Sequence, residues 1–175
     1  MRAQRSKLLP QPSARKLSVT FKTLIDIRPA AYFALSIAIL VLPISWVLSA
    51  ISAVTIHECG HICMLLLRKI PIQKIEIGAT GARIHTPYQS NTDELLTAAA
   101  GPAMGLLAAG LIHIPMVRIC CFVQSLFNLM PVYPLDGGRI LRSACIFWAG
   151  ESKYLLIYRI MQMLLMSCIL FFLFY

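Results

Sequence analysis

Long apolar runs set the strongest limit on what this chain can fold into. Residues 30–67 contain no Lys, Arg or Asp, and their only acidic or histidine side chains are His57, Glu58 and His61. Because a transmembrane helix needs about 20 predominantly apolar residues, this run of 38 residues has room for two spans, and Pro43 is predicted to mark the turn between them. The run is too long for the hydrophobic region of a cleaved signal peptide.

The overall composition supports a membrane protein. Hydrophobic residues make up 58 % of the 175 residues and charged residues 13 %, whereas an average soluble domain has about 25 % charged residues. This much apolar surface cannot be buried inside so small a globule, because small domains have a large surface for their volume. The composition therefore excludes an ordinary soluble domain, a disordered chain and a disulfide-stabilised scaffold.

The net charge of +9 is concentrated near the N-terminus. Residues 1–28 hold seven Lys and Arg side chains and one acidic residue, Asp26. A basic segment directly before an apolar run is typical of a cytoplasmic flank, so we expect contact with the lipid bilayer and no nucleic-acid partner. We therefore predict a basic cytoplasmic tail over residues 1–28, with a short strand within 18–28, and a single membrane-embedded domain over residues 29–175.

Three later apolar segments, 95–115, 119–130 and 154–175, predict further helices in the membrane. Isoleucines and glycines over about residues 70–86 predict two short strands with a glycine turn at the membrane surface. The predicted fold is an all-α integral membrane bundle of about four to five transmembrane helices with this small interfacial β-strand region. The Lys and Arg residues between spans predict a multi-pass cell-membrane protein with a cytoplasmic N-terminus, and they place the ends of the second and fourth spans on the cytoplasmic side.

The few polar residues inside the second span form an H-E-x-x-H motif, His57 to His61. Positions i and i+4 of a helix share one face, so both imidazoles can bind one metal ion, and Glu58 is close enough to reach a water on that ion. Ionisable side chains inside a span are costly, and metal coordination supplies a reason for three of them within five residues. The alternative is a buried, hydrogen-bonded polar cluster.

A catalytic zinc site has three protein ligands and one open position, so a third ligand is needed. Asp136 is the best candidate, because it follows a proline-interrupted span on the side where the His57–His61 helix ends, and Gly137 and Gly138 permit a sharp turn beside it. Other acidic and histidine residues remain open as candidates: Asp93, Glu94, Glu76, His85 and His113.

These motifs together resemble the site-2 protease family of intramembrane zinc metalloproteases. The resemblance rests on H-E-x-x-H at 57–61, Ala-Ala-Gly-Pro at 99–102 and N-x-x-P-x-x-P-L-D-G from Asn128 to Gly137, and it is strongest to small bacterial members related to the sporulation pro-sigma-factor processing protease. It implies one Zn²⁺ ion held by three ligands, a general base, and a side chain that faces the substrate and supports its carbonyl. By motif position, the resemblance implies that the three zinc ligands are His57, His61 and Asp136. It implies that Glu58 is the general base and that Asn128 is the side chain that faces the substrate.

The function implied by the resemblance is a zinc metalloendopeptidase that hydrolyses peptide bonds within or near the transmembrane segments of membrane-anchored proteins. Its expected partners are that protein substrate, the bilayer and a regulatory membrane protein, and its site is expected toward the cytoplasmic side. The strand region at 70–86 is a candidate for pairing with extended substrate backbone. Two alternatives remain: a catalytically silent membrane scaffold or regulator, and a metal-binding membrane protein such as a transporter.

Overall fold

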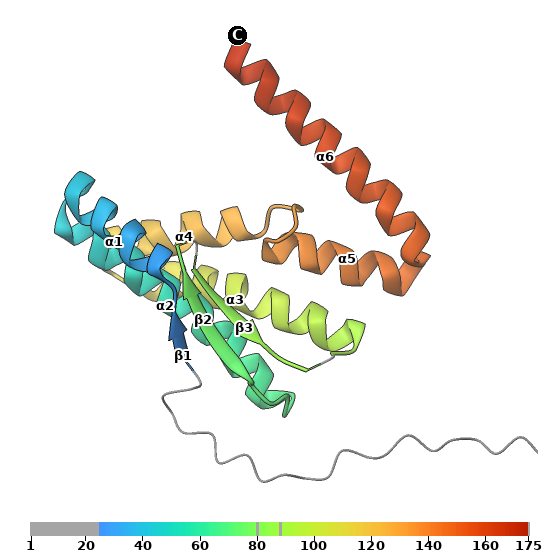
Figure 1. The fold of residues 1–175 in the computed structure, drawn as a ribbon, viewed down its shortest axis with the longest axis horizontal. Helices are drawn as coiled ribbons and strands as arrows, with labels where there is room; N and C mark the ends of the chain where they lie inside the picture. The colour runs from blue at the N-terminus through green and yellow to red at the C-terminus, as the bar shows by residue number, and fades with distance from the viewer. Residues whose placement is uncertain (1–24, 80, 88, 175) are drawn as a thin grey trace, which may run out of the picture.

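The computed structural model describes residues 25–79, 81–87 and 89–174 and shows helices packed beside a small sheet (Figure 1). The predicted basic tail before residue 25 lies outside the described residues. In chain order the elements are β1 Ile25–Ile27, α1 Pro29–Val41, α2 Ile44–Leu67, β2 Lys74–Gly78, β3 Gly81–His85, α3 Asn91–Leu111, α4 Pro115–Asn128, α5 Asp136–Ala149 and α6 Glu151–Phe174. The prediction of a mainly helical protein with a small β region is therefore confirmed.

Proline and capping residues set several helix ends. Pro43 separates α1 from α2, as predicted. The hydroxyl oxygen of Ser90 accepts a hydrogen bond from the backbone N–H of Asp93 and caps the start of α3. Pro115 occupies the first turn of α4, where the missing N–H costs nothing, so this helix begins four residues before the predicted segment at 119. The sequence pattern thus locates every helix except α5, which the apolar segments do not predict.

Helices α2, α3 and α4 form the centre of the bundle, and small residues let them approach closely. A Cβ atom on Gly60 of α2 would lie 2.8 Å from the Cβ of Met104 on α3. On the other side of α3, a Cβ on Gly105 would collide with the buried hydroxyl of Ser125 on α4. Small residues therefore sit at the contacts between these helices.

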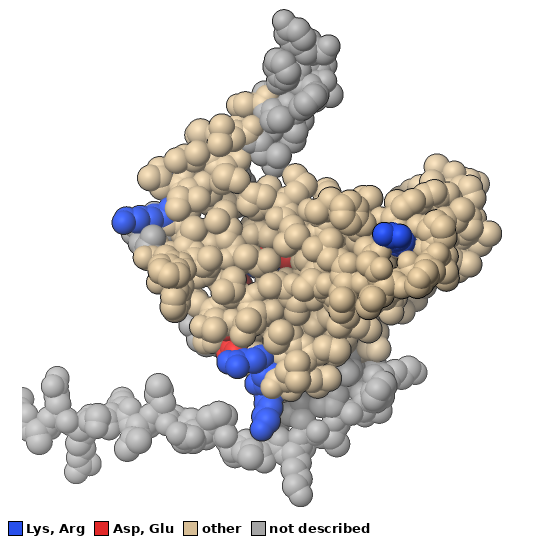
Figure 2. Space-filling view, turned by 180° about the vertical axis from the view of Figure 1, so that it is seen from behind, with Lys and Arg blue, Asp and Glu red and all other residues tan. Residues whose placement is uncertain are grey.

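Helices α2 and α3 are each long and apolar enough to cross a membrane, whereas α1 is a shorter apolar helix of 13 residues. Large apolar side chains project outward, among them Leu40, which is 86 % exposed, and Phe33, which is 70 % exposed. Figure 2 shows one face of the molecule on which few charged side chains interrupt the uncharged surface. This surface suits contact with lipid rather than water.

The three strands form one sheet in the order β1-β2-β3, with β1 parallel and β3 antiparallel to β2. Gly81 has a φ of +127°, a conformation that favours glycine at the start of β3. Strand β1 falls within the segment predicted to form a short strand. Ion pairs join it to the hairpin: Arg28 to Glu76 at 2.8 Å and Lys74 to Asp26 at 2.8 Å.

Docking of β1 is expected to depend on pH through Glu76. Its carboxylate accepts hydrogen bonds from Lys74 and Arg28 and lies near His85, and these groups, Lys74 foremost, lower the pKa of Glu76 to about 2. Because this pKa is below the unfolded value of about 4.3, the stabilising contribution of Glu76 is complete above about pH 5 and is lost as the pH falls toward 2. A spin label on exposed Ile27 should gain mobility over that range.

The Glu76→Gln variant should show the mobile label already at pH 7 and should lack the acid transition. The matched control is His85→Gln, which removes the 3.4 Å contact between His85 and Glu76 and leaves both Glu76 hydrogen bonds from Lys74 and Arg28 in place. An immobile label in Glu76→Gln at pH 7 would show that backbone pairing alone holds β1.

Candidate metal centre

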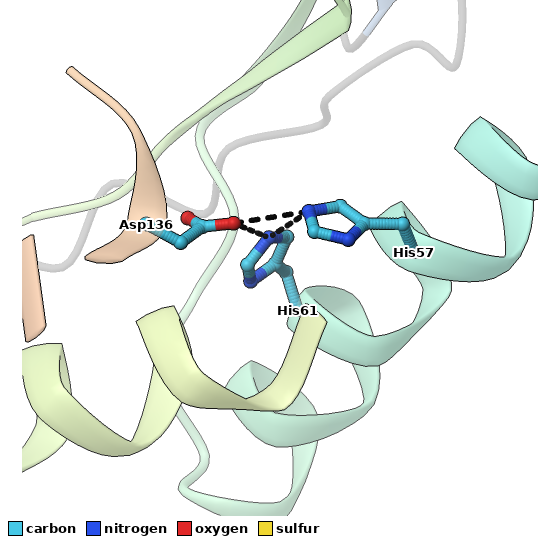
Figure 3. A group of neighbouring side chains, drawn as sticks. All are labelled: His57, His61 and Asp136. Carbon is cyan, nitrogen blue, oxygen red and sulfur yellow. Dashed lines mark hydrogen bonds and ion pairs between the residues drawn. The ribbon is translucent and has the colours of Figure 1, made fainter. Parts of the chain in front are cut away.

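Two helices bring three ligand atoms together in the interior (Figure 3). His57 and His61 lie one turn apart on the same face of α2, and Asp136 is the first residue of α5. All three are buried, with exposed fractions of 4 %, 6 % and 7 %. One ligand atom from each lies within 4.8 Å of the others, and among the described residues no other group of three or more His, Cys, Asp or Glu meets this criterion.

The backbone before α5 explains how Asp136 comes to face α2. Leu135 is extended and ends the loop that follows α4, and the first turn of α5 packs directly beneath this loop. A Cβ on Gly137 would collide with the carbonyl of Leu129, and one on Gly138 would lie 2.5 Å from the backbone N of Tyr133. Both glycines are therefore required for close packing, and neither has a positive φ. Glycine is needed at both positions, as predicted, but the reason is the lack of room for a Cβ atom rather than an unusual backbone turn.

The hydrogen-bond partner of His61 fixes the direction of its lone pair. Its Nδ1 lies 2.7 Å from the carbonyl oxygen of Thr97 on α3. Since a carbonyl only accepts, Nδ1 carries the hydrogen, and in the neutral ring Nε2 carries the lone pair. That Nε2 atom faces Asp136 Oδ2 at 3.2 Å and His57 Nε2 at 3.1 Å. Thr97 is thus the outer partner that a metal-binding histidine requires.

The three donor atoms fit a metal ion in spacing as well as in chemistry. His57 Nε2 lies 3.0 Å from Asp136 Oδ2, which closes a triangle with sides of 3.0, 3.1 and 3.2 Å. Ligands at about 2.0–2.1 Å from a tetrahedral zinc lie about 3.3 Å from one another. The lone pair of His61 Nε2 and a buried carboxylate oxygen repel each other at this distance, and a cation between them would remove that repulsion. The residues present therefore fit a divalent metal.

Glu58 reaches from α2 toward the sheet. Its Oε1 atom accepts a hydrogen bond from the backbone N–H of Ala82 in β3 at 3.3 Å. A Cβ on Gly81 would lie 3.6 Å from the same oxygen, which is ordinary contact. The hairpin that the sequence predicts at the membrane surface thus holds the carboxylate that follows the first histidine of the motif.

The remaining candidates make other contacts. The side-chain amide of Asn128, the last residue of α4, donates to the carbonyl of Gln124 at 3.2 Å. Its predicted contact with substrate stays a prediction. Of the alternative third ligands, Glu76 and His85 form an ion pair in the sheet. Asp93 and Glu94 form ion pairs at the N-terminus of α3, and His113 is exposed.

Two contributions to the site have no signal in the sequence pattern, because they come from the backbone: the carbonyl of Thr97 and the N–H of Ala82. A third, the glycine in Ala99-Ala100-Gly101-Pro102, is visible in the sequence, but its place beside the two imidazoles is not. A Cβ on Gly101 would lie 2.9 Å from His57 Nε2 and would collide with His61. The missing side chain of Gly101 is what leaves room for the two imidazoles.

Comparison with known proteins agrees with this site. No protein-family model matches the chain. A protein of Synechocystis sp., provisionally named a zinc metalloprotease, is 30 % identical over 64 % of this chain and 36 % of the relative, so the chain spans about a third of that protein's length. The solved Site-2 Protease from Methanocaldococcus jannaschii superimposes with a TM-score of 0.57 over 77 % of this chain and 72 % of that one, at 24 % identity. The chain therefore has the site-2 protease fold, and its resemblance to that family, first indicated by the motifs, is confirmed.

Proposed function

We propose that the protein is a zinc metalloendopeptidase that cleaves membrane-anchored proteins within or near their transmembrane segments. One observation carries the proposal: the three buried donor atoms of His57, His61 and Asp136 converge on one point, and Glu58 follows the first of them in the same helix. The relative with a metalloprotease name and the shared fold support the same conclusion.

The metal proposed for this site is one zinc ion. Two imidazoles and one carboxylate are the ligand types of catalytic zinc sites, which keep a fourth position open for water or substrate. When bound, zinc would lower the pKa of its water to about 7 and polarise the scissile carbonyl. The direct hydrogen bond from His61 to Thr97 holds that imidazole in the tautomer that such binding requires.

Glu58 is proposed to move the proton. As general base it takes a proton from the attacking water, and it then returns the proton to the leaving amide nitrogen of the substrate. The N–H of Ala82 keeps one carboxylate oxygen in place and leaves the other to accept the proton. Asn128 is proposed to donate its amide hydrogen to the substrate carbonyl, on the basis of its motif position alone.

Access to the site follows from the membrane setting. We propose four to five spans with a cytoplasmic N-terminus, which puts the metal centre toward the cytoplasmic side. Two of the described helices are long and apolar enough to cross a membrane, which supports the membrane setting. A transmembrane substrate helix hides its carbonyls in hydrogen bonds, so it must unwind before cleavage. Strand β3 lies at one edge of the described sheet, beside Glu58, and we propose that it pairs with the unwound backbone of the substrate. A regulatory membrane partner that controls this access is part of the proposal.

The test is to purify the full chain in detergent, measure its zinc content and assay cleavage of a model membrane-anchored substrate. We expect about one zinc per chain, loss of cleavage with a chelator and recovery when zinc is added back. Asp136→Ala should lose the zinc, because two histidines alone leave the site one ligand short. The control is Asp26→Ala, which removes an exposed carboxylate that pairs with Lys74 in the sheet, outside the metal centre.

Three results would count against the proposal. Full zinc occupancy in Asp136→Ala would mean that another residue is the third ligand. Bound zinc without cleavage of any membrane-anchored substrate would favour a metal-binding membrane protein. Cleavage that persists after the zinc is removed would exclude the metal chemistry altogether.

A further inference from the structure

The first turn of α3 carries two acidic residues that link it to both ligand-bearing helices. Asp93 pairs with Arg68, the residue that ends α2, at 2.7 Å. Glu94 pairs with two arginines of α5, with Arg142 at 3.5 Å and with Arg139 at 3.8 Å. Since α2 provides both histidines and α5 provides Asp136, α3 ties together the two helices on which the metal centre depends.

Arg139 makes one contact that Arg142 does not. Its Nη1 atom lies 3.5 Å from Oδ1 of Asp136, the carboxylate three residues earlier on the same face of α5. The other carboxylate oxygen, Oδ2, faces His57 and His61. The two oxygens of Asp136 therefore have different partners: one contacts a guanidinium and the other faces the proposed metal position.

We propose that Arg139 is a positioning residue for the metal ligand Asp136, and that Glu94 holds Arg139 in place. This inference rests on the proposed zinc function. A guanidinium anchored by a second carboxylate fixes the rotation of the Asp136 carboxylate, so that Oδ2 alone is presented to the metal. Partners that orient a metal ligand in this way commonly contribute about 10- to 100-fold to metal affinity.

The direction of the change in zinc affinity distinguishes a positioning role of Arg139 from an effect of its charge alone. A cation a few ångströms from the ligand carboxylate repels a divalent metal ion, so the loss of the Arg139 charge alone would tighten zinc binding. The loss of ligand orientation would weaken it. Our proposal is that orientation dominates, and the sign of the change in zinc affinity therefore tests it directly.

The experiment compares Arg139→Gln with Arg142→Gln in the full chain in detergent. Both variants remove one positive charge and one contact with Glu94, but only the first removes the contact with Asp136. Zinc affinity is measured by competition with a chelator, and the absorption spectrum of the Co²⁺-loaded protein reports coordination geometry. We expect zinc to bind about 10- to 100-fold more weakly in Arg139→Gln, with an altered Co²⁺ spectrum, and little change in Arg142→Gln.

Arg139→Lys keeps the charge but lacks the planar fork needed to contact Asp136 and Glu94 together, so its zinc affinity should be intermediate. It also keeps the question answerable if Arg139→Gln does not fold. Equal zinc affinity in wild type and Arg139→Gln, tighter zinc in Arg139→Gln, or wild-type affinity in Arg139→Lys would each overturn the role of Arg139. Failure of the wild type to bind zinc would instead remove the proposed function itself.

Discussion

Glu58→Gln is expected to reduce kcat/KM for cleavage of a membrane-anchored substrate by about 100- to 10,000-fold. Glutamine has nearly the same size and still accepts the hydrogen bond from Ala82 through its carbonyl oxygen, but it cannot take a proton from water. Zinc should stay bound at the wild-type level, because Glu58 is not part of the three-residue donor group. The measurements are initial cleavage rates and zinc content on the same preparations.

Two further variants sharpen the interpretation of that result. Cys59→Ser changes the neighbouring residue, whose side chain is exposed on α2, and should leave both cleavage and zinc content unchanged. Glu58→Asp keeps a carboxylate but withdraws it by one methylene, so its rate should fall between those of wild type and Glu58→Gln. An undiminished rate in Glu58→Gln would mean that another group takes the proton.

The fold was predictable where apolar pattern and proline act locally. Pro43 between α1 and α2 could be located from the sequence. The position of β1 beside β2 could not, because it depends on ion pairs between residues far apart in the chain, such as Arg28 and Glu76. The number of spans stays a prediction, since two of the described helices have the length and composition to cross a membrane.

The metal centre was predictable where side-chain type and spacing define it. The i, i+4 spacing puts His57 and His61 on one face of α2, and the position of Asp136 after an interrupted span makes it the best third ligand. From the sequence alone, by contrast, Arg139 and Arg142 are both interpreted only as cytoplasmic positive charges. The structure separates them because it shows that a helix begins at Asp136, which places Arg139 three residues later on the same face as that carboxylate.

The second large effect is expected from Gly101→Ala, which should remove the metal while leaving the helix intact. A methyl group at this position would collide with His61 and come within 2.9 Å of His57 Nε2. Either imidazole could move only by rotating away, and for His61 that would also break the hydrogen bond to Thr97. Zinc sites tolerate displacements of about 0.2 Å in ligand distance, so we expect zinc affinity to fall by about 100-fold or more.

Gly110→Ala is the matched control for this prediction, because the same substitution in the same helix meets no atom within 4 Å. Alanine favours a helix over glycine by about 1 kcal/mol, so neither variant should weaken α3 itself. Zinc content, zinc affinity and thermal unfolding of the metal-free protein are measured for both. Loss of zinc in Gly101→Ala with a metal-free unfolding temperature no lower than wild type would place the effect at the imidazoles. Wild-type zinc affinity in Gly101→Ala would contradict the prediction, because the two histidines would then bind metal without needing the space beside α3.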